Sequence, residues 1–175
     1  MTEAFREVLP EADAFPAEDA KARDAARDVR IRPAEERDVP AIAALEKCCF
    51  PDAWSENSVM GTLNSPIGYV LIAEAPDGEG EKRPRGYLIA QILDDEGELL
   101  RIAAAPEERR RGTGRLLLER MLADHPEARI WRLDVRTKNA AAIALYEKYG
   151  FRIAAENRDV YREPKDNGYL MIRKS

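Results

Sequence analysis

Apolar positions recur along this chain with two different periods, and their order predicts the succession of strands and helices. Short apolar or alternating runs bounded by Gly, Pro or Asp are typical of strands. Such runs are VRIRP, GYVLIAEA, GYLIAQIL, ELLRIAAA, ARIWRLDVR, FRIAAENRDVYR and GYLMIRK. Segments with helical spacing separate some of them, which gives the expected order β-α-α-β-β-β-α-β-α-β-β. We therefore predict an α/β (α+β) domain in which helices cover a mixed sheet.

The first two helices carry local signals for their ends. Pro40 suits the first turn of a helix, and Ile42 and Leu45 recur along it at helical spacing. Ser55 has the side chain of a helix N-cap, so a second, short helix is expected from there through Leu63.

Two further helices are predicted in the second half of the chain. The segment TKNAAAIALYEKYG reads as a helix closed by Gly150. Before it, the segment Gly114–Ala123 is strongly amphipathic, with an apolar face made of Leu117, Leu118, Met121 and Leu122. Between two earlier strands, residues 75–86 (APDGEGEKRPRG) are expected to form a charged hairpin loop.

Length and composition favour one compact domain. The chain has 175 residues, of which 45% are hydrophobic, enough for a packed core. It holds no run of about 18 apolar residues, the length that a membrane-spanning helix needs. Acidic residues stand near the N-terminus, where a signal peptide carries positive charge. We expect a cytoplasmic protein that does not associate with membranes.

Charge is distributed unevenly along the chain. Residues 1–28 hold eight acidic and four basic residues, so residues 29–175 carry only −1 of the total charge of −5. The first segment also lacks a persistent apolar period, and we predict an acidic extension that is mobile or loosely docked. The nearly neutral remainder, residues 29–175, is the predicted folded domain. It lacks the basic surface typical of direct nucleic-acid binding.

Cysteine and histidine usage excludes several kinds of chemistry. Cys48 and Cys49 are adjacent, so they cannot staple the fold or form a zinc site, and we interpret them as helix-packing residues. His125 is the single histidine and stands in the turn-like stretch ADHPEAR, where we expect a surface loop residue. We therefore expect no metal.

The segment Arg109–Arg115 (RRRGTGR) predicts an anion-binding turn. It lies between an apolar strand and the amphipathic helix, where the first helical turn leaves N–H groups unpaired and partly positive. Two glycines allow a sharp turn and a close approach to a ligand, which suits a pyrophosphate. No Gly-Lys-Ser/Thr follows Gly114, and Leu117 excludes G-x-G-x-x-G, so neither common nucleotide motif fits. The alternative is a solvated basic loop with a glycine turn.

Three motifs in the correct order resemble the GNAT N-acetyltransferases. The Arg-Arg-x-Gly-x-Gly turn is similar to the acetyl-CoA signature of that family. Residues 133–151 (LDVRTKNAAAIALYEKYGF) and the stretch FPDAWSENSV resemble the RimI-type branch, which acetylates the N-terminal alanine of a small-subunit ribosomal protein. The resemblance covers residues 29–175. It implies a mostly antiparallel sheet splayed between two central strands, acetyl-CoA as co-substrate, and an acyltransferase that acts as a monomer or weak homodimer.

The resemblance also implies residues for the cofactor. Backbone groups of Ile102, Ala103 and Ala104 would pair with the pantetheine arm as another strand would. Asn139 would hydrogen-bond the same arm, and Tyr146 would contact it near the thioester sulfur. The pyrophosphate would be held by Arg110, Arg111, Gly112, Thr113, Gly114 and Arg115.

For catalysis, the resemblance implies Tyr146 as general acid and Asp134 as general base, at a position where the RimI branch usually has glutamate. Each also has a purely structural interpretation. Tyr146 can be a core residue, and Asp134 can pair with Arg132 or Arg136 on the same strand face. Glu98 is a reserve base.

On the acceptor side, the resemblance implies that Phe50, Trp54 and Tyr161 border the groove, although Phe50 and Trp54 are also plausible core residues. The favoured acceptor is a protein N-terminal amine, with a ribosomal protein as candidate. A small amine such as an amino acid or polyamine is the first alternative. A non-catalytic acyl-CoA-binding module is the second.

Overall fold

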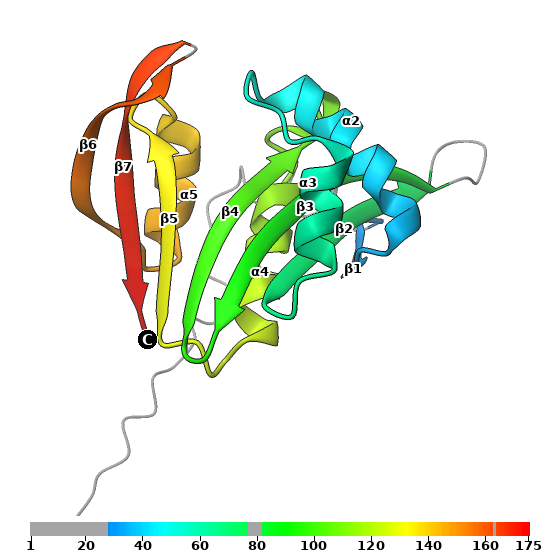
Figure 1. Ribbon diagram of the computed structural model, residues 1–175, viewed down its shortest axis with the longest axis horizontal. Helices are drawn as coiled ribbons and strands as arrows, with labels where there is room; N and C mark the ends of the chain where they lie inside the picture. The colour runs from blue at the N-terminus through cyan, green and yellow to red at the C-terminus, as the bar shows by residue number, and fades with distance from the viewer. Residues whose placement is uncertain (1–27, 77–81, 163) are drawn as a thin grey trace, which may run out of the picture.

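The computed structural model describes residues 28–76, 82–162 and 164–175, and these form one seven-stranded sheet in the order β1-β2-β3-β4-β5-β7-β6 (Figure 1). Strands β4 and β5 run parallel, and the other neighbouring strands are antiparallel. The predicted fold class and order of elements are confirmed. The predicted acidic extension lies outside the described residues, apart from Asp28.

The element bounds follow the predicted segments closely. The strands are β1 (Arg30–Pro33), β2 (Gly68–Pro76), β3 (Lys82–Leu93), β4 (Glu96–Ala104), β5 (Ile130–Arg136), β6 (Arg152–Arg162) and β7 (Lys165–Lys174). The helices are α2 (Val39–Cys49), α3 (Glu56–Leu63), α4 (Thr113–Asp124) and α5 (Ala140–Lys148), with single 3-10 turns η1 (Glu36–Asp38) and η2 (Pro106–Glu108).

Predicted helix ends are confirmed by their geometry. Ser55 caps α3 by accepting a hydrogen bond from the Ser58 N–H at 3.2 Å. Gly150 follows α5 with a φ of +86°, a left-handed conformation that favours glycine.

The expected hairpin loop at residues 75–86 is wrong at both ends, because Ala75 and Pro76 belong to β2 and β3 begins at Lys82, while residues 77–81 lie outside the described residues. Residues Lys82–Gly86 belong to β3, where Lys82 lies opposite Pro76 and Arg83 opposite Ala75. Pro84 is tolerated there because a bulge interrupts the β2–β3 register beside it and β4 pairs only from Gly86 onward. The Gly and Pro residues of this segment therefore predicted strand ends too early, because the β2–β3 pairing continues through Pro84 to Lys82.

Two hydrophobic clusters lie on opposite faces of the sheet. In Figure 1, α2 and α3 cover one face of β2–β4 and α4 covers the other. The α4 face is packed with Leu117, Leu118 and Met121, as predicted, against alternating β5 residues that include Trp131 and Leu133. The α2–α3 face forms the second cluster, whose buried members are Ala34, Val39, Ile42, Val59, Val70, Ile72, Tyr87 and Ile89.

The expectations for His125 and Cys48 need correction. His125 is half-buried, with its ring edge-on to Tyr69 at 4.5 Å between centroids, because it ends α4 against the sheet. Cys48 is exposed, whereas Cys49 is half-buried with its Sγ 3.5 Å from the Ala104 carbonyl oxygen. Only Cys49 therefore packs as expected.

The sheet opens between its two central strands. The β4–β5 ladder runs from Glu96 opposite Ile130 to Leu99 opposite Leu133 and extends no further in the described residues. Figure 1 shows the two ribbons close together at that end and apart at the other. The predicted splay is thus present, and the later part of β4 offers backbone groups without a strand partner on the β5 side.

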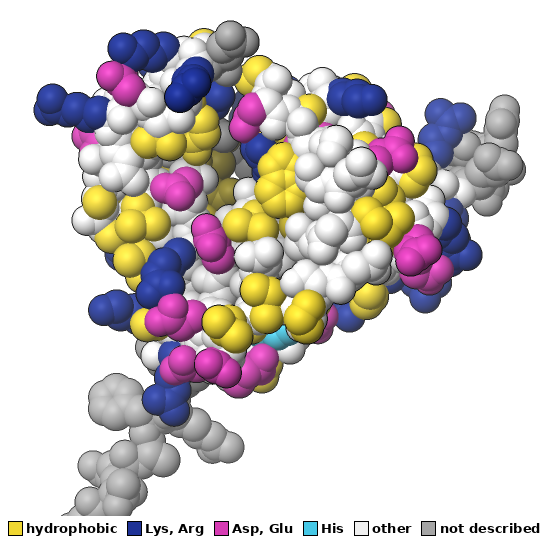
Figure 2. All heavy atoms as spheres, in the orientation of Figure 1, with side chains coloured by type: hydrophobic (Ala, Val, Ile, Leu, Met, Phe, Trp, Pro, Cys, Tyr) yellow, Lys and Arg dark blue, Asp and Glu magenta, His cyan; other side chains and the backbone are white. Residues whose placement is uncertain are grey.

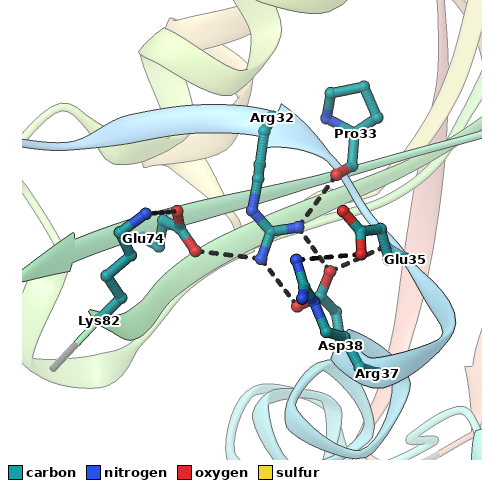
Figure 3. Close-up of polar contacts among 7 residues, drawn as sticks. All are labelled: Arg32, Pro33, Glu35, Arg37, Asp38, Glu74 and Lys82. Atoms are coloured by element: carbon teal, nitrogen blue, oxygen red, sulfur yellow. Dashed lines mark hydrogen bonds and ion pairs between the residues drawn. The ribbon is translucent and has the colours of Figure 1, made fainter.

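An ion-pair cluster fixes the β1 edge of the sheet (Figure 3). The Arg32 guanidinium donates to Asp38 at 2.6 Å and 2.9 Å and to Glu74 at 3.0 Å. Lys82 adds a contact of 3.2 Å to Glu74. Because Asp38 and Glu74 are buried, these pairs compensate the cost of taking carboxylates out of water.

Candidate active site

The open edge of β4 supplies two residues for a ligand strand. The Ala105 N–H donates to the Arg85 carbonyl of β3 at 2.8 Å. Because alternate residues of a strand point to the same neighbour, the backbone of Ala103 also faces β3, and Ile102 and Ala104 face the opening. The expectation that all three residues pair with a pantetheine arm is therefore corrected, since β3 already uses the backbone groups of Ala103.

The glycine-rich turn lies at the start of α4, as predicted, and its backbone leaves helix N–H groups unpaired within the helix. Gly112 has a φ of +89°, which its lack of a side chain permits, and Arg110 is also left-handed with a φ of +63°. The Leu116 N–H is the first that bonds back, to the Gly112 carbonyl. The N–H groups of Thr113, Gly114 and Arg115 thus have no acceptor within the helix.

No contact or backbone angle within the described protein requires glycine at position 114. A Cβ placed there would meet only Leu145 Cδ2, at 3.9 Å, which is an ordinary contact, and its backbone is not left-handed. The space beside the helix N–H groups is therefore open at this position. A ligand can approach the helix N-terminus closely there.

The buried carboxylate of Glu108 connects this turn to strand β3. Glu108 accepts from Arg85 at 2.7 Å and lies 3.7 Å from Arg111. Thr113 is buried, and its hydroxyl has no hydrogen-bond partner among the described residues. Sequence reasoning missed Glu108 and Arg85, because a Glu in PEERRR carries no signal that distinguishes it from solvated neighbours.

Asn139 stands before α5 as its N-cap, and not within the helix as expected. Its side-chain oxygen accepts from the Ala142 N–H at 3.2 Å, which leaves the amide NH₂ for a ligand. Tyr146 lies in α5, 5% exposed, with its ring 5.8 Å from that of Phe151. Tyr146 is therefore both a core residue and a candidate donor.

The pKa values of Tyr146 and Tyr161 are both raised. Burial raises the pKa of Tyr146 above its ordinary value, and Tyr161 adds to that effect. The pKa of Tyr161 is raised by burial and then by Asp134, with Arg136 and Arg101 opposing. Tyr161 thus lies within electrostatic range of both Tyr146 and Asp134, which come from α5 and β5.

Asp134 is free of the ion pairs that its structural interpretation required. Arg132 pairs with Glu96 at 2.5 Å, and Arg136 donates to the Pro164 carbonyl at 2.7 Å. Within the described parts of the chain, no hydrogen bond or ion pair engages the Asp134 carboxylate. Partial burial raises the pKa of Asp134. Glu98, the reserve base, lies opposite Arg132 in the closed part of the β4–β5 ladder.

A hollow of about 350 Å³ lies at the open end of the sheet. It is lined by Pro51, Asp52, Arg136, Val160, Tyr161 and Arg162. Figure 2 shows the surface hollowed between the β5–β7 side and the α2–α3 side. Of the predicted acceptor residues, Tyr161 lines the hollow. Phe50 and Trp54 are half-buried behind it against the α2–α3 cluster, and the lining residues Asp52 and Arg136 were missed.

Comparison with known proteins decides the family. The Acetyltransferase (GNAT) family matches residues 21–151. The chain belongs to the GNAT acetyltransferase family.

Curated relatives specify the branch of this GNAT protein. The [ribosomal protein bS18]-alanine N-acetyltransferase of Salmonella typhimurium is 38% identical over 128 residues, which cover 71% of this chain and 81% of that protein. The enzyme of the same name from Escherichia coli K12 is 35% identical over 130 residues, which cover 73% and 83%. The predicted RimI-type N-acetyltransferase is thereby confirmed.

Solved structures agree with the GNAT assignment. The crystal structure of the ribosomal-protein-S18-alanine N-acetyltransferase from Escherichia coli matches with a TM-score of 0.74 at 29% identity, covering 83% of this chain and 93% of that one. Arabidopsis thaliana NAA60 in complex with acetyl-CoA has the same fold, with a TM-score of 0.74 at 19% identity over 84% and 99% of the chains.

The residues of this GNAT chain fit the cofactor that its family implies. Free helix N–H groups beside a glycine suit a diphosphate, and a strand edge without a partner suits an amide-bearing arm. Among the described residues, no three His, Cys, Asp or Glu side chains gather in a way that would hold a metal ion. Each helix in the described part of the chain is too short or too polar to cross a bilayer.

Proposed function

We propose that this GNAT protein transfers an acetyl group from acetyl-CoA to the α-amine of a protein N-terminus. Its candidate acceptor is the N-terminal alanine of the ribosomal protein on which its curated relatives are named to act. One observation carries the proposal. Among the residues that the structure describes, the later part of β4 has no strand partner on the β5 side, and Asp134 follows the last paired residue of β5, so a cofactor lying along this edge would meet an acceptor near Asp134.

The cofactor would be held by two sets of groups in this chain. The N–H groups of Thr113, Gly114 and Arg115, with the side chains of Arg110 and Arg111, suit a diphosphate. Ile102 and Ala104 offer strand-like hydrogen bonds to the arm, and the Asn139 NH₂ offers one more. When bound, acetyl-CoA supplies the activated acetyl thioester.

Asp134 has the position and the chemistry of the base. An α-amine has a pKa of about 7.7–8.0, so part of it is neutral near pH 7 and the base need remove a proton only from the remainder. Asp134 is not engaged by another side chain within the described residues. Because aspartate is one methylene shorter than glutamate, a bridging water is the expected route for the proton.

Tyr146 has the chemistry of the acid. Burial raises the pKa of Tyr146, so its phenol stays protonated at neutral pH. Its hydroxyl forms no hydrogen bond with the described residues and is free to donate to a departing thiolate.

The hollow on the acceptor side has room for more than the reacting amino group. It has a volume of about 350 Å³ and extends from Tyr161 to Asp52. We infer that it takes the residues that follow the acetylated N-terminus.

A thiol-release assay tests this function. Peptides that begin with alanine or serine should release coenzyme A thiol in the presence of acetyl-CoA, and the same peptides with blocked N-termini should not. Reaction with free amino acids or polyamines alone would assign a small-amine acceptor. Binding of acetyl-CoA with no release by any amine would assign a binding module.

A further inference from the structure

We propose that Arg101 is a positioning residue for the acceptor, because it ties the loop Phe50–Trp54, behind and beside the hollow, to strand β4. This inference rests on the proposed function. It concerns a residue that faces neither the cofactor turn nor the candidate acid and base.

Arg101 is surrounded by the loop on several sides. Its Nη2 donates to the Asp52 carbonyl oxygen at 3.1 Å and to the Asp52 carboxylate at 3.0 Å. Its guanidinium carbon lies 4.8 Å from the centre of the Phe50 ring and 5.4 Å from that of Trp54. The Arg101 side chain is only 15% exposed, so these contacts are largely shielded from water. A planar guanidinium can contact two aromatic rings and bind a carboxylate at the same time.

A buried carboxylate supports the same arrangement. Glu46 in α2 is fully buried and accepts from the Trp54 N–H at 2.9 Å and from the Tyr87 hydroxyl at 2.5 Å. The Glu46 carboxylate also lies 3.9 Å from Arg101 Nε. Because a buried charge needs such partners, Glu46 joins α2, β3, β4 and the loop into one unit.

The location of Arg101 links this unit to both substrate sides. In β4 it directly precedes Ile102, which faces the cofactor opening. Its partner Asp52 lines the hollow together with Tyr161 and Arg136. Removing the Arg101 side chain should therefore shift the loop Phe50–Trp54, which contributes Asp52 to the hollow. The glycine-rich turn at the start of α4 should stay in place.

The test compares Arg101→Ala and Arg101→Lys with Arg132→Ala as matched control. Arg132 is also a strand arginine paired with a carboxylate, Glu96, but it has no contact with the loop. For Arg101→Ala we expect the peptide KM to rise about tenfold, as for loss of one charge-assisted hydrogen bond, with kcat and coenzyme A affinity unchanged. Arg101→Lys keeps the charge and should recover part of the KM, and the control should leave it unchanged.

Hydrogen exchange of the Trp54 amide gives a second readout that needs no turnover. Exchange of this amide should be faster in Arg101→Ala than in the wild type and intermediate in Arg101→Lys. Amides of the sheet should exchange at wild-type rates. An unchanged KM, or an equal loss of coenzyme A affinity, would overturn the inference. If the wild-type protein acetylates no peptide, the proposed function fails, and unchanged Trp54 exchange would then overturn the positioning role by itself.

Discussion

Single residues at the opening of the sheet have environments that suit opposite tasks. Tyr146 is buried in the core with its pKa raised, which keeps its proton available for donation. Asp134 is exposed on the same strand that buries Leu133, and no side chain in the described ranges pairs with it. Both residues were predicted by resemblance, whereas their environments follow from packing that a single sequence does not display.

Replacing Tyr146 by phenylalanine tests the acid. Tyr146→Phe should lower kcat by about 100-fold, because the departing thiolate loses its proton donor, and leave coenzyme A affinity unchanged. Stopped assays of thiol release and calorimetry measure the two quantities. Tyr149→Phe is the matched control, since the Tyr149 hydroxyl bonds to Glu119. Equal losses of turnover and affinity in Tyr146→Phe would contradict the acid role.

Asp134 is tested by its pH profile. Asp134→Asn should lower kcat/KM by about 100-fold below pH 7 and progressively less at higher pH, where the acceptor α-amine is already neutral. Asp134→Glu should stay active, because it restores the longer carboxylate usual in the RimI branch. A pH profile for Asp134→Asn that parallels the wild-type one would remove Asp134 as the base.

The ion-pair cluster at the β1 edge predicts acid sensitivity. Arg32 lowers the pKa of Asp38 and, against burial, also that of Glu74. Carboxylates with lowered pKa stabilise the fold above their unfolded pKa of about 4, and this contribution is lost as pH falls through their folded values. Asp38→Asn should therefore cost about 3 kcal/mol at neutral pH.

Urea unfolding at several pH values measures this effect. The difference in unfolding free energy between wild type and Asp38→Asn should shrink as pH falls below about 4. Glu35→Gln, which removes a solvent-exposed pair with Arg37, is the control and should cost under about 0.5 kcal/mol. A difference that stays constant with pH would show that the cluster does not act through ionised Asp38.

At the scale of elements, the helix ends could be predicted from local residues, whereas the strand ends that depend on pairing could not. Ser55 and Gly150 marked helix ends correctly because capping depends on neighbours within a few residues. The run Lys82–Gly86 was wrongly expected to be loop, because its strand conformation comes from pairing with β2, which no local pattern contains. The direction of the Ala103 backbone, toward β3, also depends on strand pairing and could not be predicted from the local sequence.

Helix α3 offers two substitutions of opposite sign. Ser55→Ala removes the cap and should lower the unfolding free energy by about 1 kcal/mol. Gly61→Ala should raise it by about 0.5–1 kcal/mol, because a Cβ there meets no other atom within 4 Å and alanine favours the helix. Thermal or urea unfolding checks both. Destabilisation by Gly61→Ala would contradict the helix assigned to residues 56–63.

At the scale of the whole molecule, the splay between β4 and β5 brings the predicted motifs together. The glycine-rich turn follows β4 in the sequence, α5 follows β5, and the splay separates the later part of β4 from the end of β5. The resemblance anticipated this opening, because three motifs stood in the right order. It did not indicate Asp52, Arg136, Glu108 or Arg101, since their roles arise from contacts between elements that carry no local pattern.

The central claim is that the backbone at the start of α4 binds the diphosphate of coenzyme A, and Gly114 tests it most directly. A Cβ at position 114 fits the described protein, and on this account it would crowd a diphosphate held by the N–H groups of the helix N-terminus. Calorimetric titration of coenzyme A should show binding to the wild-type protein and at least about tenfold weaker binding to Gly114→Ala, with a Tm that is not lowered. No heat with the wild type, or equal affinity in both proteins, would contradict the account.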